Sequence, residues 1–339
     1  MESDLNIKNV KELYNLFDKI YLEEVKPYIE NNFPRNKFTE PVYYILDELK
    51  LRRFRAAFPL ILANYFNISK EKILPIAATS ELIFTIALVQ DDFFDRDDFR
   101  LDIKTAPKKF GKEVSIASSD YSYTYIFKML KQLVNKVSKE TLAKINNSYI
   151  EAHERLYASF LMELLTNRDI TFSLKKVIEL HKAKTIQGTN AFFCTALICE
   201  ESNNIKLSEE LKKYCLNLAV AGQIKNDVYD LYRYAKIRGY SDLLNGYMNY
   251  PLAKLLELSN KEEKERIKKL FEENKVNEIV KLIKEKGIIT SCIEDCSDYV
   301  EKSIDIINKL KINEELRKLL FLWAEGNKIN SDQFSSEKR

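Results

Sequence analysis

The sequence predicts one all-α domain of ten or more helices around a central cavity, and three observations support this fold class. Of the 339 residues, 45% are hydrophobic, so the chain can bury a sizeable core. With only 7 Gly and 7 Pro, it has few sites for tight turns or strand bends. Apolar residues recur at three- and four-residue spacing along most of the chain, which is the period of an amphipathic helix.

The helical segments follow one another without a linker, a repeat or a low-complexity stretch. Short punctuating stretches separate them at 31–36, 105–111, 166–173, 199–208, 238–251 and 285–288. Ser173 and Ser208 stand where N-caps would open the helices that follow. The segments at about 70–98 and 207–236 are the most apolar, so we expect them to be central helices. We assign residues 1–328 to a single helical domain and 329–339 to a frayed polar tail.

Charge and cysteine content narrow the function classes. The chain has 54 Lys and Arg against 51 Asp and Glu, a net charge of +3, so we expect no nucleic-acid partner. The first residues lack the apolar core of an export signal, and the cysteines number five, so we expect a cytoplasmic protein with buried, reduced thiols. No apolar run reaches the roughly 20 residues that a transmembrane segment needs.

One apolar helix runs directly into a dense group of aspartates. The stretch ELIFTIALVQDDFFDRDDFR occupies residues 81–100. Asp91 and Asp95 are four residues apart and share one helical face, with Asp92 beside them. These carboxylates repel one another, and the helix dipole disfavours anions at a C-terminus. Alone, the motif is compatible with either a solvated acidic turn or a cation site.

A second oxygen-rich motif favours the cation site. QIKNDVYD places Gln223, Asn226, Asp227 and Asp230 on another apolar helix, with Asn226 and Asp230 on one face. Carboxylate and amide oxygens suit Mg²⁺ rather than zinc. Two such helix ends that face each other across a bundle would hold several Mg²⁺ ions, and the ions would hold a diphosphate.

With these motifs, residues 45–255 resemble the class I isoprenoid synthases of the trans-polyprenyl diphosphate synthase type. DDFFD resembles the family's DDxxD, and QIKNDVYD resembles FQxxDDxxD. RLDIKTAPKKFG at 100–111 resembles RRGxPTxHxxFG, and AKT at 183–185 contains the family's KT pair. SDLLNGYMNYP resembles SDxxxGKxTxP, and KLRRFRAAFP resembles GGKRxRP. Six motifs in the family's order make chance similarity a poor explanation.

The resemblance implies an isoprenoid synthase helical bundle, a homodimer and an allylic prenyl diphosphate substrate. It implies a site for three Mg²⁺ ions made by Asp91, Asp92, Asp95, Asn226, Asp227 and Asp230. It implies catalytic roles for Arg100, Lys184 and Gln223. It implies that the diphosphate-binding cations are Arg52, Arg53, Arg55, Arg100, Lys184 and Lys236. The substrate pocket it implies is lined by Phe84, Ile86, Ala87, Leu88, Phe160 and Thr185.

The chain departs from the family where a second diphosphate would bind. Chain-elongating members hold isopentenyl diphosphate with four ligands, which align with Arg52, Arg53, Phe84 and Leu101. Two of these four positions are therefore apolar, and Tyr247 replaces the lysine of SDxxxGK. Phe84 lies seven residues before Asp91, two turns back on the same face, where its ring would either face a cation or pack in the core.

Three functions remain open from the sequence. The leading expectation is a Mg²⁺-dependent, terpene-synthase-like enzyme that ionises farnesyl or geranylgeranyl diphosphate and cyclises or deprotonates the cation. The alternative is a prenyltransferase that elongates with isopentenyl diphosphate or prenylates another acceptor. A non-catalytic subunit that binds prenyl diphosphates ranks third, because a retired subunit should have lost both acidic motifs.

Overall fold

The computed structural model describes residues 7–171, 173–203, 205–232 and 240–330. The predicted all-α fold is confirmed, since these residues contain sixteen α-helices and one hairpin of two short strands. The expected tail at 329–339 lies largely outside the described residues, as does Lys236.

The N-terminal half of the chain contains the hairpin and the first half of the bundle. Its elements are α1 (Val10–Ile20), a π-helical turn (Tyr21–Val25), α2 (Lys26–Asn32), α3 (Glu40–Glu48), α4 (Phe54–Tyr65), α5 (Lys70–Phe94), β1 (Phe99–Arg100), β2 (Ile103–Lys104), α6 (Ala106–Phe110), α7 (Lys112–Leu130), a 3₁₀ turn (Lys131–Leu133) and α8 (Lys139–Leu165).

The C-terminal half is helical throughout its described part. Its elements are α9 (Leu174–Asn203), α10 (Ser208–Asp230), α12 (Ser241–Leu244), α13 (Tyr250–Leu258), α14 (Lys261–Glu272), α15 (Val276–Glu285), α16 (Ile288–Lys309) and α17 (Glu314–Glu325).

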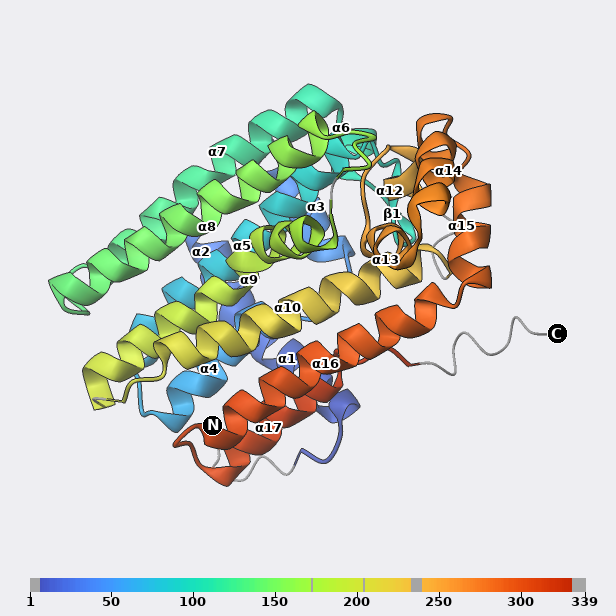
Figure 1. Cartoon of the computed structure of the whole chain (residues 1–339). Helices are drawn as coiled ribbons and strands as arrows, with labels where there is room; N and C mark the ends of the chain where they lie inside the picture. Colours follow the sequence, from blue (N-terminus) through green and yellow to red (C-terminus); the bar gives the residue numbers. More distant parts are fainter. Residues whose placement is uncertain (1–6, 172, 204, 233–239, 331–339) are drawn as a thin grey trace.

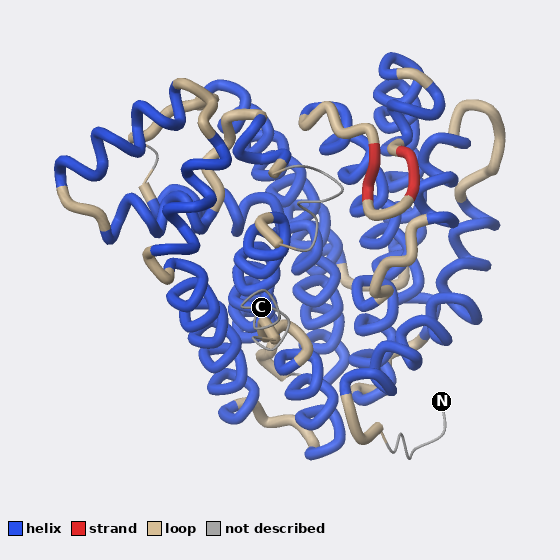
Figure 2. Tube along the Cα trace, turned by 90° about the vertical axis from the view of Figure 1, so that its right-hand side faces the viewer, coloured by secondary structure: helices blue, strands red, loops and turns tan. Residues whose placement is uncertain are grey.

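Long helices dominate the arrangement in space. The antiparallel pair α7 and α8 forms one flank of the bundle, and α9, α10 and α16 run beside one another below it (Figure 1). The shorter helices α12 to α15 gather at one end, next to the hairpin (Figure 1). The strands of this hairpin stand out against an otherwise helical tube in the turned view (Figure 2). Helix α9 packs against both α5 and α10, and this contact brings the two motif-bearing helices to one site.

The two helices expected to be central are buried. Most of α5 is apolar and enclosed, because α4, α7 and α9 all pack on it. It ends at Phe94, four residues before the predicted end, and Arg96 then takes a left-handed conformation with φ of +59°. By length and composition α5 alone, among the described helices, could cross a membrane, but 89% of its most apolar stretch is buried in the fold.

Two apolar clusters fill the interior. The main one extends through all the long helices, and the smaller one lies between α3, α5 and α6. The smaller cluster is formed by Tyr44, Ile45, Leu49, Leu88, Val89 and Ala106, with Leu51, Phe84, Leu101, Ile103 and Phe110 packed against it. All five cysteines are free and buried, as expected.

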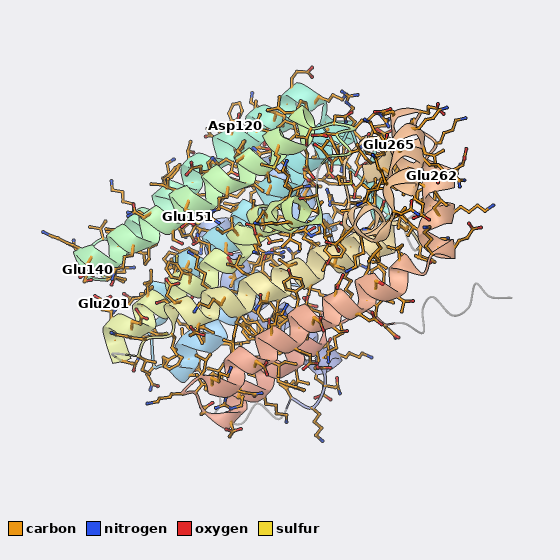
Figure 3. All side chains as sticks on the ribbon, in the orientation of Figure 1. Asp120, Glu140, Glu151, Glu201, Glu262 and Glu265 are labelled. Atoms are coloured by element: carbon orange, nitrogen blue, oxygen red, sulfur yellow. The ribbon has the colours of Figure 1, made fainter. Side chains whose placement is uncertain are left out.

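Exposed acidic side chains cover the outside of the bundle, and one of the two predicted N-caps is present. The labelled acidic side chains, among them Glu262 and Glu265 of α14, lie over the outside of the bundle (Figure 3). Ser173 caps α9, because its Oγ accepts the Lys176 N–H at 3.4 Å. Ser208 instead donates its Oγ–H to Glu200 at 2.6 Å and is the first residue of α10.

Candidate active site

The ends of α5 and α10 are linked electrostatically through Asp242. Asp91 lies in the last turn of α5, and Asp95 is its C-cap. The pKa of Asp95 is raised by burial and then by the negative charges of Asp91, Glu163 and Asp242. The pKa of Asp242 is in turn raised by burial and by Asp230 and Asp227 of α10. The two acidic helix ends therefore face a common space.

Arg100 binds the first motif. Its Nη2 lies 2.6 Å from Asp91 Oδ2, and its Nε lies 2.7 Å from Asp92 Oδ1. Burial raises the pKa of Asp92 to about 6, although the Arg100 charge opposes this shift. Because Asp92 is completely buried against Arg100, it anchors this guanidinium, while Asp91 remains partly exposed to the site.

Lys184 lies between the two acidic helix ends. Its Nζ is 2.6 Å from Glu163 Oε1, and both side chains are largely buried. Burial alone would lower the pKa of Lys184, but Glu163, Asp91 and Asp95 together raise it. Glu163 was missed from the sequence, although it ends the SFLME stretch in which Phe160 had been assigned.

The second motif divides into anchored and open side chains. Asp227 Oδ2 accepts the Tyr250 N–H at 2.7 Å and lies 3.2 Å from His181 Nε2. Asp230 is buried, whereas Asn226 is exposed. Asp227 thus connects α10 to the start of α13, and the charge of Asp230 acts on Asp242.

Residues 241–250, which we call the closing segment, connect the two motifs. Asn245 Nδ2 donates to the carbonyl of Asp95 at 2.7 Å, and the Tyr247 hydroxyl donates to the carbonyl of Phe94 at 3.4 Å. Arg168 holds the segment from outside, since its N–H donates to the Gly246 carbonyl at 2.7 Å. The segment also supplies Asp242, a carboxylate that sequence reasoning had not singled out.

The three arginines of the KLRRFRAAFP motif have different surroundings. Arg53 is buried in an ion pair with Glu81 (2.5 Å) and donates to the Leu46 carbonyl at 2.7 Å. Arg52 is exposed and stacks on Tyr14, 4.5 Å from its ring centroid. Arg55 stacks on Phe84 at 3.4 Å, so it is Arg55 and not Arg53 that reaches the position where the family's second diphosphate ligands align.

The predicted pocket residues separate into two groups. Ile86 is fully buried in the main core and Leu88 in the smaller cluster, so these two pack in the interior rather than line an open pocket. Ala87 and Phe84 are half-buried. Phe160 packs against Phe94, with ring centroids 5.2 Å apart.

Thr185 and Gln223 lie in the same region as Lys184 and the second motif. The Thr185 hydroxyl donates to the His181 carbonyl at 2.7 Å, which fixes it within α9. Gln223 is half-buried one turn before Asn226 on α10. The structure therefore places both beside the charged site, and their predicted roles in substrate binding and catalysis stay predictions.

The donor set suits a hard divalent cation. The available groups are carboxylate and amide oxygens. Burial and then mutual repulsion raise the pKa of Asp95 and Asp242, so added positive charge would stabilise the site. Within the described residues, no three acidic, His or Cys side chains are already gathered around one metal position. Arg100 and Lys184 neutralise part of the negative charge through ion pairs with Asp91 and Glu163.

Comparisons with known proteins agree with the fold and the motifs. Residues 35–286 match the family described as Polyprenyl synthetase. The chain is 22% identical over 302 residues to the geranylgeranyl diphosphate synthase of Sulfolobus acidocaldarius, which covers 86% of this chain and 89% of that protein. It is 22% identical over 278 residues to the octaprenyl diphosphate synthase of Haemophilus influenzae, covering 80% of this chain and 82% of that one.

Solved structures show the same fold. The geranylgeranyl pyrophosphate synthetase of Pyrococcus horikoshii superimposes with a TM-score of 0.79 at 20% identity, covering 95% of this chain and 99% of the other. A decaprenyl diphosphate synthase from Rhodobacter capsulatus gives a TM-score of 0.81 at 18% identity, with coverage of 93% and 98%. Because the matched family spans most of the chain and both acidic motifs lie within the match, the chain belongs to the polyprenyl synthetase family.

Proposed function

We propose that this protein is a Mg²⁺-dependent prenyltransferase that ionises an allylic prenyl diphosphate and joins the prenyl group to isopentenyl diphosphate. The names of its relatives, such as prenyl transferase and octaprenyl diphosphate synthase, favour transfer over the cyclisation that the sequence departures had suggested. The acidic helix ends that share one site support ionisation of a diphosphate.

Each side chain has a role that its position supports. Asp91, Asp95, Asn226 and Asp230 would hold Mg²⁺, which would neutralise the diphosphate and make it a better leaving group. Arg100 would contribute positive charge from the first motif. Glu163 and Asp242 would add carboxylates near the Mg²⁺ ions, and Lys184 would add positive charge near the departing diphosphate.

The proposed reaction has a defined balance. The allylic carbon–oxygen bond breaks, and its electron pair leaves with the diphosphate. The double bond of isopentenyl diphosphate forms a carbon–carbon bond to the allylic carbon, and the departing diphosphate accepts the proton lost from the adjacent carbon. The products are a longer prenyl diphosphate and inorganic diphosphate. The packed apolar side chains around the site, such as Phe94 and Phe160, would keep water from the cation.

The observation that carries the proposal is the unpaired Nε–H of Arg55. Arg53 forms an ion pair with Glu81, whereas the buried Nε of Arg55 has no hydrogen-bond acceptor among the described side chains. A buried donor without an acceptor is costly, and a phosphate-type anion that binds this guanidinium would satisfy it. An enzyme that only ionises one allylic diphosphate has no use for a second anion site at this place.

The decisive experiment supplies farnesyl or geranylgeranyl diphosphate and Mg²⁺ to the purified protein, with and without isopentenyl diphosphate. The proposal expects diphosphate release and longer prenyl diphosphates only when isopentenyl diphosphate is present. Hydrocarbons or prenyl alcohols formed without it would instead establish the second candidate, a terpene-synthase-like ionisation. That candidate is favoured by one observation, the apolar Phe84 and Leu101 at two expected ligand positions.

We further propose that the protein forms a homodimer through α7 and α8. Of the fifteen most exposed large apolar side chains in the described residues, nine lie on these helices or the turn between them. Phe127 is 65% exposed and Ile150 is 61% exposed, and both line an apolar groove of about 420 Å³. A second copy of this chain would cover this face, since exposed apolar patches of this kind mark interaction surfaces.

A further inference from the structure

Arg55 is half-buried, and one of its donors is unpaired. Its Nε is buried and has no hydrogen-bond partner among the side chains that the structure describes. Glu81 acts on it electrostatically, but that carboxylate is bonded to Arg53. A guanidinium normally places its five donors against carboxylates, carbonyls or water, so the absence of an acceptor at Nε requires an explanation.

Two aromatic rings cover the guanidinium. Its central carbon lies 3.4 Å from the ring centroid of Phe84 and 4.3 Å from that of Phe54. Each ring is fixed by a different part of the interior. Phe54 packs on Trp323, with ring centroids 5.0 Å apart, and Phe84 packs against the smaller apolar cluster. Arg55 therefore lies where the two apolar clusters meet, and each cluster has one partly buried ring beside its guanidinium.

A glycine borders the Nε of this guanidinium. Gly188 lies on α9, one turn after Lys184, and a Cβ at this position would be 3.1 Å from Arg55 Nε. Any larger residue would crowd the donor that has no acceptor. Glycine is thus the residue type that fits beside Nε without displacing the guanidinium.

We propose that Phe54, Phe84 and Gly188 form a frame that positions Arg55 and presents its N–H edge to the diphosphate of the acceptor substrate. The two rings stabilise the guanidinium through cation–π contacts and fix its plane. Bidentate recognition of a phosphate depends on that plane, so the frame orients the charge that binds the acceptor. This inference rests on the proposed function, and it gives Phe84 the role of a positioning residue.

The frame also explains why an aromatic residue is tolerated at an expected ligand position. Phe84 cannot bind a phosphate, but it contacts the cation that can. Its loss would free the Arg55 side chain to rotate, and the acceptor would then bind a mobile charge. The allylic diphosphate, which the acidic site and Arg100 would bind, should be affected little.

The test compares three single variants with the wild-type protein: Phe84→Leu, Phe84→Tyr and Gly188→Ala. We expect Phe84→Leu to raise the KM for isopentenyl diphosphate about tenfold, equivalent to about 1.4 kcal/mol, with the KM for the allylic substrate unchanged. Phe84→Tyr keeps an aromatic face and should restore a KM close to that of the wild type. Gly188→Ala should raise the same KM, because it crowds the Nε edge.

Phe110→Leu is the matched control. Phe110 packs against the same apolar cluster as Phe84 and has no contact with Arg55 among those that the structure describes, so it reports the cost of lost packing alone. Thermal unfolding of every variant separates folding defects from binding defects. The frame is refuted if Phe84→Leu leaves the KM for isopentenyl diphosphate unchanged. It is also refuted if Phe84→Leu and Phe110→Leu change the KM values for both substrates to the same extent.

A direct binding measurement separates failure of the frame from failure of the proposed function. Inorganic diphosphate is titrated calorimetrically into the metal-free wild-type, Arg55→Met and Phe84→Leu proteins. Weaker diphosphate binding by both variants supports the frame, whether or not isopentenyl diphosphate is turned over. Absence of that turnover would overturn the proposed function alone. Equal binding by all three proteins overturns the frame.

Discussion

Removal of the Arg53 side chain should destabilise the fold far more than removal of Arg55, two residues away. The Arg53 side chain is 8% exposed and that of Glu81 is 1% exposed, and Arg53 also donates to the carbonyls of Leu46 and Leu49. Arg53→Met leaves Glu81 as a buried charge without its partner, which costs about 3–5 kcal/mol. Arg55 has no such partner to abandon, so Arg55→Met should change stability little.

Urea denaturation followed by circular dichroism measures the free energy of unfolding of both variants, and thermal denaturation measures their melting temperatures. In a chain of 339 residues, a loss of this size should lower the melting temperature of Arg53→Met by about 4–7 °C. The double variant Arg53→Met, Glu81→Met should recover most of the stability, because apolar residues can replace a buried ion pair at little net cost. The reasoning is refuted if Arg53→Met is as stable as the wild type, or if the double variant is as unstable as the single one.

Three further predictions address the acidic site, the closing segment and the dimer. Asp91→Ala combined with Asp95→Ala, or chelation of Mg²⁺ with EDTA, should reduce diphosphate release by on the order of 10³-fold, and activity that persists in EDTA would contradict the assigned metal role. Gly246→Ala should lower both stability and activity, because φ is +78° and a Cβ would lie 2.7 Å from Arg168 Cγ. Gly287→Ala is the matched control, because φ is +67° but a Cβ would meet no atom within 4 Å. It should lower the free energy of unfolding by only about 1 kcal/mol and leave activity unchanged. Phe127→Asp with Ile150→Asp should convert the proposed dimer to a folded monomer in light scattering. A wild-type monomer, or an unchanged dimer mass in the variant, would contradict the proposed interface of α7 and α8.

The parts of the fold that depend on local spacing could be predicted from the sequence. Helices α5 and α10 begin within one residue of their expected starts, because the apolar period that defines them is contained in each segment. Helix α10 ends at Asp230, six residues before its expected end. The end of α5 was misplaced by four residues, since the left-handed turn at Arg96 is set by the hairpin that follows and not by helical spacing.

Asp91 and Asp95 could be grouped from the sequence because one motif contains both, and the charge of Asp91 adds to burial in raising the pKa of Asp95. Their roles as metal ligands, and that of Asp230, stay predictions. Glu163 and Asp242 were missed because they reach it from α8 and from the closing segment, and only the packing of α9 between the motifs brings them together. Linear alignment also could not distinguish Arg53 from Arg55, because the start of α4 at Phe54 decides which of them faces Glu81.

The contacts of the closing segment with the end of α5 and with Arg168 use a main-chain carbonyl as the acceptor, and this determines which substitutions they tolerate. Asn245 and Tyr247 hold carbonyl oxygens of α5, and Arg168 holds the carbonyl of Gly246. Because these acceptors are main-chain carbonyls, a side-chain substitution at Phe94 or Asp95 leaves both acceptors in place. Substitution of Asn245 or Tyr247 removes a donor, so the contact between the closing segment and the end of α5 depends on the side chains of the closing segment.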